Sequence, residues 1–144
     1  MRLSTRSRYG ARATLEMARN WGKCHTKRKD IARSQSISES YLENILIALK
    51  NDGIVRTVRG ARGGFSLTRA PSDITLFEVI SSLEGDLSPV ECAVKADACD
   101  RSARCAMRRV YERLKRAQEE VLGSYTLQDL VEQTKALGIQ DFCI

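Results

Sequence analysis

The sequence predicts a mainly α-helical protein with one small β-hairpin and a long helix near its C-terminus. Three observations predict this class. Apolar residues recur at helical spacing along much of the chain, short β-rich runs flank one glycine-rich turn, and residues 103–121 contain an apolar heptad row. With 144 residues, 42% of them hydrophobic, the chain can form one packed domain with an appended helix.

The N-terminal third predicts three helices. Ser4 can cap a helix that runs to about Asn20, and a short helix is expected over residues 27–33. Ser38 can cap a third helix, ESYLENILIALKND, which stops at Gly53 and has a buried stripe of leucine and isoleucine. The turn-forming link SQSIS joins the last two helices, and the second has a polar N-terminal face. This arrangement is typical of a helix-turn-helix.

The next segment predicts a basic hairpin. The runs IVRTV and FSLT are rich in β-forming residues and surround VRGARGG, which places Arg59 and Arg62 at the tip. A glycine-rich hairpin directly after a helix-turn-helix is typical of a wing, whose arginines can enter the narrow minor groove of DNA. The alternative is an exposed hairpin whose charges only keep the protein soluble. The order of the elements favours the wing.

The C-terminal half predicts a helix over residues 74–83, a loop, and a long helix over residues 102–123. The long helix carries apolar residues at spacings of 4, 3, 4, 3 and 4, the heptad rhythm of helix–helix packing: Ala103, Met107, Val110, Leu114, Ala117 and Val121. We interpret this row as a homodimer seam, although packing onto its own domain would use the same pattern. A short helix is expected near residues 127–133.

The predicted architecture is therefore a winged helix-turn-helix with a long C-terminal dimerisation helix. We assign residues 1–84 to the winged helix-turn-helix DNA-binding domain and residues 85–106 to a cysteine-bearing loop. Residues 102–144 form the dimerisation helix and the C-terminal tail.

The charge distribution indicates a polyanionic partner at one end of the protein. The net charge is +6, but residues 1–70 carry 15 Lys and Arg against 5 Asp and Glu, whereas the remainder is net negative. Such asymmetry favours binding of double-stranded DNA by the N-terminal half, although a solvated basic surface is the alternative. The residues expected to contact DNA are polar side chains of the third helix and arginines of the hairpin: Ser38, Ser40, Tyr41, Glu43, Asn44, Arg59 and Arg62.

Other classes of protein find little support. No apolar run is long enough for a membrane span, and the N-terminus lacks the apolar core of a signal peptide, so we expect a cytoplasmic protein. The chain has one histidine and no phosphate-binding loop, which argues against an enzyme.

Three of the five cysteines lie in one polar segment, CAVKADACDRSARC, as Cys92, Cys99 and Cys105. Clustered cysteines in a reducing compartment more often bind metal or carry out redox chemistry than form structural disulfides. Thiolates suit both iron–sulfur clusters and zinc, and this spacing matches neither the ferredoxin run nor a zinc ribbon. Cysteines without metal, used as thiol switches, are the remaining possibility.

Four separated segments resemble one known family. The opening MRLSTRSRYGARATLEMA, the segment ISESYLENIL, the hairpin VRGARGGFSL and the loop EGDLSPVECAV are similar to the Rrf2 family of bacterial transcription regulators. The resemblance is strongest to its iron–sulfur cluster regulators, while EGDLSPVE and the ending DFCI are similar to its regulators of cysteine metabolism. It implies a homodimer that binds a near-palindromic operator. It also implies that residues 85–106 are a cluster-binding loop in which Cys92, Cys99 and Cys105 hold an iron–sulfur cluster, [2Fe-2S] in the first place and [4Fe-4S] as the alternative.

The sequence departs from that family pattern at one position. The cluster-binding members carry a histidine three residues after the third cysteine, and Arg108 stands there in this chain. Arginine does not normally coordinate metal, so the fourth ligand stays open among nearby acids, a partner subunit, solvent and a small thiol. The alternatives are an Rrf2-type regulator without a cluster, controlled by a regulatory protein partner or by thiol oxidation, a zinc-stabilised regulator, and an electron carrier.

Overall fold

A computed structural model describes residues 2–138, so the last residues of the predicted tail, 139–144, lie outside the described part. The helices are α1 (Thr5–Arg19), α2 (Arg28–Gln35), α3 (Glu39–Asn51), α4 (Leu76–Glu84), α5 (Ala106–Gly123) and α6 (Leu127–Ala136). Two strands, β1 (Val55–Val58) and β2 (Gly64–Leu67), form an antiparallel hairpin, and 3₁₀ turns span Pro71–Asp73, Glu91–Ala93, Ala96–Ala98 and Ser102–Arg104. The predicted class, mainly helical with one small hairpin, is confirmed.

The helix starts follow from serine caps. The Ser4 side chain accepts a hydrogen bond from the Ser7 amide at the start of α1, and Ser38 accepts one from the Tyr41 amide at the start of α3. Between α2 and α3, Ser36 adopts a left-handed conformation with φ of 54°, which reverses the chain within a few residues. The helix-turn-helix arrangement expected from the sequence is therefore present.

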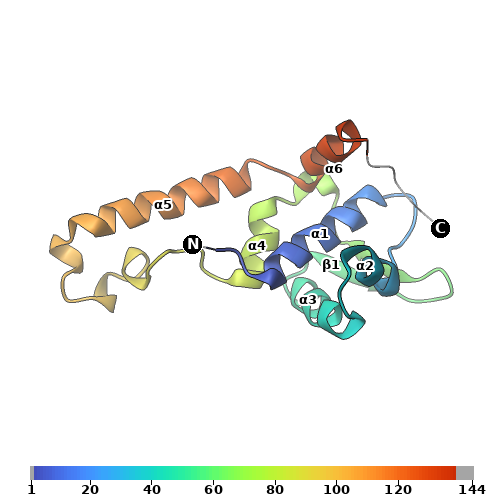
Figure 1. Cartoon of the computed structure of the whole chain (residues 1–144), viewed down its shortest axis with the longest axis horizontal. Helices are drawn as coiled ribbons and strands as arrows, with labels where there is room; N and C mark the ends of the chain where they lie inside the picture. Colours follow the sequence, from blue (N-terminus) through green and yellow to red (C-terminus); the bar gives the residue numbers. More distant parts are fainter. Residues whose placement is uncertain (1, 139–144) are drawn as a thin grey trace.

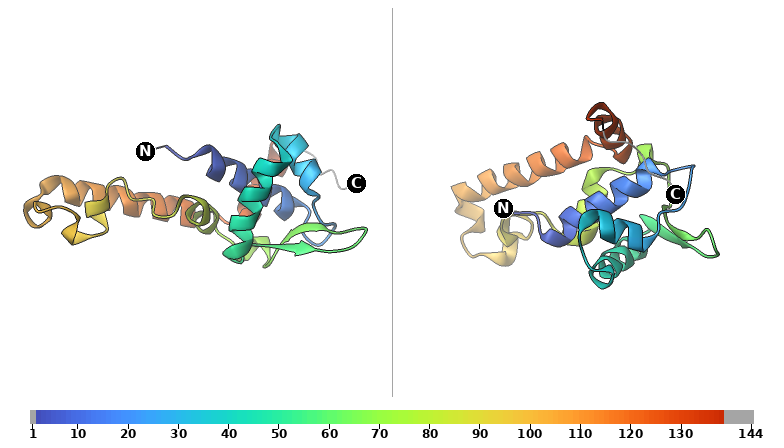
Figure 2. Two further views of the ribbon diagram at one scale, coloured as in Figure 1. Left: turned by 90° about the horizontal axis from the view of Figure 1, so that it is seen from below. Right: turned by 45° about the vertical axis from the view of Figure 1, so that its right-hand side comes forward.

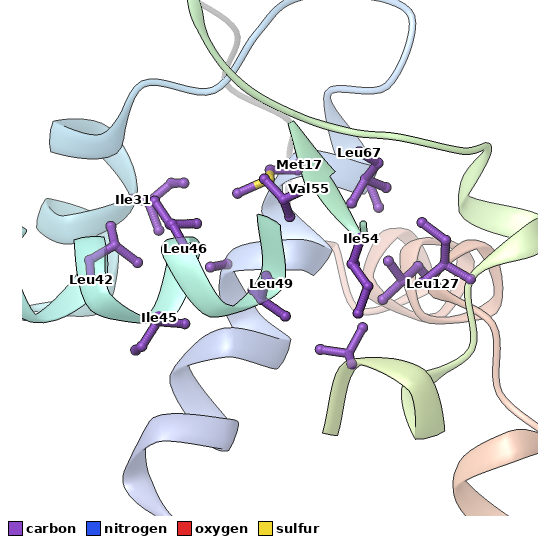
Figure 3. Close-up of a cluster of buried hydrophobic side chains, with 14 of the residues drawn as sticks. Met17, Ile31, Leu42, Ile45, Leu46, Leu49, Ile54, Val55, Leu67 and Leu127 are labelled. Atoms are coloured by element: carbon purple, nitrogen blue, oxygen red, sulfur yellow. The ribbon is translucent and has the colours of Figure 1, made fainter. Parts of the chain in front are cut away.

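The core lies between α1, α3, α4, the hairpin and α6 (Figure 3). Met17 of α1 and Ile31 of α2 pack there against the expected stripe of α3, which is buried. The stripe consists of Leu42, Ile45, Leu46 and Leu49. Leu127 of α6 is fully buried in the same cluster. The last described helix thus packs on the N-terminal module, although it follows the long helix in sequence.

The start of α4 depends on a contact that sequence periodicity cannot predict. We expected the helix from Ile74, but it begins at Leu76 behind a capping box formed by Thr75 and Glu78. Thr75 forms an isolated antiparallel bridge with Thr126, and the Ile74 carbonyl accepts a hydrogen bond from the Leu127 amide at 2.9 Å. Extended backbone at residue 74 therefore joins α4 to the start of α6.

The hairpin is tied to the segment between α1 and α2. Thr26 and Phe65 exchange two backbone hydrogen bonds of 3.0 and 2.8 Å, so residues beside Thr26 lie along β2. Gly64 permits this approach, because a Cβ at that position would lie 2.7 Å from the Thr26 carbonyl oxygen. Strand β2 is thus hydrogen-bonded on one side to β1 and on the other side to Thr26.

Helix α5 extends away from the compact module (Figures 1 and 2). The chain leaves α4, runs outward through the cysteine segment, residues 92–105, and returns along α5 to α6 (Figure 1). The cysteine segment and the hairpin therefore lie at opposite ends of the longest dimension. Within residues 2–138, no helix combines the length and the apolar character that crossing a bilayer requires.

Candidate DNA-binding surface and cysteine segment

The outer face of α3 presents the polar residues that the sequence analysis selected. All five selected positions of this segment are exposed: Ser38, Ser40, Tyr41, Glu43 and Asn44. The hydroxyls of Ser38 and Ser40 lie 3.3 Å apart at the start of the helix, where free backbone amides can also bind a phosphate. The buried stripe on the opposite side fixes which face of α3 meets solvent.

A salt bridge from α2 controls the acidic side chains on this face. Arg28 lies 3.1 Å from Glu39 and 2.8 Å from Glu43, measured between nitrogen and carboxylate oxygen. The pairing offsets the repulsion between these carboxylates and a phosphate backbone, and it restricts the position of the exposed Glu43 side chain. All three side chains are exposed by a third or more, so the pair contributes little to stability.

Tyr41 has a packing role as well as an exposed edge. Its ring meets the Tyr9 ring edge-on with centroids 6.3 Å apart, and the Arg12 guanidinium lies 5.9 Å from the Tyr9 centroid. Arg12 and Ile47, which is 49% exposed on the outer face of α3, are not among the DNA-contacting residues expected from the sequence. Helical spacing from Ser40 and Asn44 could have identified Ile47, whereas the position of Arg12 required the fold.

The hairpin carries Arg59 and Arg62 on its exposed tip. Gly60, between them, has φ of 111°, a conformation that side chains rarely adopt, so the tight turn depends on glycine there. In Figure 2 the hairpin projects beyond the helices next to α2 and α3. The two arginines are thus available to a ligand that also contacts α3.

The three cysteines of the segment are free thiols. Cys99 is exposed, and Cys92 and Cys105 are partly buried. Within residues 2–138, no three His, Cys, Asp or Glu side chains lie close enough together to hold a metal ion. The donor chemistry therefore suits an iron–sulfur cluster, while the described arrangement of the segment does not gather its ligands.

Two ion pairs organise the surroundings of the segment. Arg108, at the position where the resemblance implies a histidine, lies 3.0 Å from Glu112 one turn later in α5. Lys115 lies 3.4 Å from Asp86, which ties α5 to the beginning of the loop. The expected long helix over 102–123 begins only at Ala106, because Ser102–Arg104 forms a separate 3₁₀ turn and Cys105 is extended.

A carboxylate joins α1 to the end of α4, where the loop begins. The Glu84 carboxylate accepts 2.5 Å hydrogen bonds from the Ser4 amide and from the hydroxyl of the fully buried Ser7. Burial raises the pKa of Glu84. Hydrogen bonds from Ser7 and Ser4 and the positive charge of Arg6 lower it by more than burial raises it, so the pKa lies below the ordinary value of 4.5. The loop to the cysteine segment thus starts from a fixed point.

Helix α5 exposes its heptad row. No residue of this helix is buried, and the apolar side chains of the row that remain exposed include Met107 at 51%, Val110 at 48%, Leu114 at 39% and Val121 at 58%. A continuous exposed row of this kind is unusual on a monomeric protein.

The chain is similar to known transcription regulators in both sequence and structure. The model of the Rrf2 family, described as iron-dependent transcriptional regulator, matches residues 3–133. The HTH-type transcriptional regulator CymR of Bacillus subtilis is 39% identical over 134 residues, which cover 93% of this chain and 92% of that protein. The structure of B. subtilis CymR, called the global cysteine regulator, has a TM-score of 0.79 at 38% identity and covers 93% of this chain and 98% of that one. The structure of T. potens IscR has a TM-score of 0.80 at 32% identity, and the match covers 99% of this chain and 94% of that one.

Proposed function

Since the chain belongs to the Rrf2 family of DNA-binding transcription regulators, we propose that it works as a homodimer that reads a near-palindromic operator and responds to chemistry at Cys92, Cys99 and Cys105. Its relatives are transcription regulators rather than enzymes. The observation that carries the proposal is one basic module with an exposed polar recognition helix and an arginine-tipped wing.

Contacts to phosphates and contacts to bases have separate roles in the proposed recognition of DNA. Lys and Arg of the N-terminal half neutralise phosphates and supply most of the affinity, which falls steeply with salt. The N-terminal end of α3 enters the major groove, where Ser40 and Asn44 hydrogen-bond to base edges, and Ser38 and Tyr41 align on the backbone. Glu43, oriented by Arg28, is suited to accept a hydrogen bond from a cytosine amino group. Arg59 and Arg62 enter the adjacent minor groove.

The dimer forms through α5. Its apolar row, exposed in one chain, would be covered by the same row of a second copy, as in other two-helix seams. A symmetric pair places two recognition helices on one face of DNA and therefore requires a near-palindromic site. The position of α5 sets their separation and tilt.

The proposed cofactor is an iron–sulfur cluster, [2Fe-2S] in the first place, held by Cys92, Cys99 and Cys105. The support is three free thiols on one polar segment and the similarity to T. potens IscR. When bound, a cluster supplies a centre that oxygen, nitric oxide or iron shortage can alter. The residues of this chain transmit the change: the segment joins α4 to α5 directly, and the Lys115–Asp86 pair links the helix to the loop.

A second candidate is a regulator without a cluster, controlled by a partner protein or by oxidation of the three thiols. Two observations favour it: Arg108 is paired with Glu112 where a fourth ligand is expected, and the described cysteines are not gathered. The similarity to CymR, named a cysteine regulator, also supports it. Iron and sulfide content with visible absorption of protein purified without oxygen separates the two candidates, because thiols alone contain neither iron nor colour.

The test of the DNA-binding function is selection of duplexes from a random library by the purified protein. We expect recovery of a near-palindromic sequence whose binding is weakened by Ser40→Ala and Asn44→Ala while the dimer persists. Recovery of no preferred sequence, or unchanged affinity in both variants, would remove the proposed recognition face.

A further inference from the structure

A second basic surface lies at the hairpin, and no described residue of the recognition helix α3 lines it. The turn after α1, the segment around Thr26 and the wing enclose an open cavity with a volume of about 770 Å³, here called the wing cavity. The Thr26–Phe65 bridge sets residues 25–27 beside β2, and β1 pairs on the other side of β2. The cavity is therefore built on the outer face of this small sheet.

The wing cavity is cationic. Its lining includes Lys23, Lys27, Arg56 and Arg62, and none of the described residues that line it is acidic. The side chains of Lys27, Arg56 and Arg62 make no ion pair or hydrogen bond in the part of the chain that the structure describes. These three like charges, which have no ion-pair partner among the described residues, repel each other and favour binding of an anion.

Two further side chains suit an oxyanion ligand. His25 lines the cavity, and its Nδ1 atom is buried and has no hydrogen-bond partner among the described residues. Trp21 supplies one apolar wall. A buried ring nitrogen without a partner is costly, and a phosphate oxygen or a bound water would satisfy it.

We propose that the wing cavity binds the phosphodiester backbone of DNA that flanks the operator, beyond the base pairs read by α3 and the wing tip. This inference rests on the proposed DNA-binding function. Two observations favour a backbone over a small anion: the four lining cations are all exposed, so the cavity is open, and Arg62 is shared with the wing tip, so the surface continues the proposed interface. Small-molecule sites usually enclose most of the ligand surface.

The test compares the double variant Lys27→Ala/Arg56→Ala with the parent protein on the selected operator, in a duplex with about one helical turn of flanking DNA on each side. Each phosphate contact adds about 0.9 to the slope of log affinity against log salt. The double variant removes two cations from each protomer of the proposed homodimer, four in all, so we expect the slope to fall by about 3.6. The affinity at about 0.1 M salt should then fall by roughly 4,000-fold, equally for operator and random duplexes.

The control variant Arg116→Ala/Lys135→Ala removes the same charge from two exposed cations outside the wing cavity and should keep most of the affinity. Trimming the flanks gives a second readout. The parent protein should lose affinity when the duplex ends at the wing, whereas the double variant should bind long and trimmed duplexes alike. Lys27→Gln/Arg56→Gln retains the aliphatic stems and repeats the test if the alanine variant melts early.

Parent-like affinity and salt slope in either folded double variant, on the long duplex, would overturn the inference. So would micromolar binding of inorganic phosphate or pyrophosphate without DNA, lost in the double variant, because that result assigns the cavity to a small anion. Failure of the parent protein to prefer any duplex would contradict the proposed function instead.

Discussion

Replacement of Leu114 by Glu is expected to separate the dimer. Full burial of a leucine, valine or methionine side chain contributes about 1.5–3 kcal/mol. Leu114 is 39% exposed in the single chain, so covering the remainder contributes about 1 kcal/mol per copy and about 2 kcal/mol across a symmetric seam. Leu114→Glu loses this contribution and also places two facing carboxylates in the seam, where each costs several kcal/mol unless it is paired.

Together these effects weaken the free energy of dimerisation by about 4 kcal/mol or more, which raises the dimer dissociation constant by about a thousandfold. Sedimentation velocity over a concentration series measures it, and Arg116→Glu, an exposed position on α5 outside the apolar row, is the matched control. We expect Leu114→Glu to be monomeric at concentrations where the parent and control are dimeric. A Leu114→Glu protein that dimerises like its parent would refute the α5 seam.

Three further predictions concern stability and recognition. Glu84→Gln should lower the free energy of unfolding by about 1 kcal/mol near pH 7. Because the folded-state pKa of Glu84 is lowered, its contribution is present above the unfolded value of 4.5 and is lost as pH falls through the folded value, so denaturant titrations should show the two proteins converging in acid. Gly64→Ala should destabilise the hairpin, since the new Cβ meets the Thr26 carbonyl at 2.7 Å, and faster amide exchange at Thr26 with an unchanged helical circular dichroism signal would be the signature; unchanged exchange would contradict it. Arg59→Ala and Tyr41→Ala should each weaken operator binding while the dimer persists, and fluorescence anisotropy showing parent affinity in both would exclude this recognition surface.

Local chemistry made much of the N-terminal module predictable. Ser4 and Ser38 cap their helices through hydrogen bonds within one turn, and the α3 stripe repeats at helical spacing. Such interactions involve neighbours in sequence, so composition and period suffice to predict them. The exposed polar face of α3 followed directly from the buried stripe.

Non-local contacts account for the differences. The start of α4 is set by the bridge between Thr75 and Thr126, a partner fifty-one residues later, and α6 packs into a core that its sequence position did not suggest. Ser102–Arg104 has ordinary helix-forming residues, yet the extended backbone at Cys105 separates it from α5. The wing cavity likewise combines the turn after α1 with the hairpin, and no local pattern links them.

The position of the cysteine segment constrains any account of sensing. The cysteine segment lies at the opposite end of the molecule from the wing of the same chain (Figure 1). A local change in the segment therefore does not touch the residues proposed to contact DNA. It can act through α5, which adjoins the segment and carries the dimer row. Coupling between such sites is typically about 1–3 kcal/mol.

The most direct test of the account measures operator affinity of protein purified without oxygen, before and after its cysteine segment is altered. The alterations are removal of any bound iron and sulfide, oxidation of the thiols, and the triple replacement of Cys92, Cys99 and Cys105 by Ser. We predict that at least one changes the affinity by about 5- to 150-fold while the protein stays dimeric. Equal affinity of all these forms for the operator would contradict the claim that chemistry at these thiols controls DNA binding.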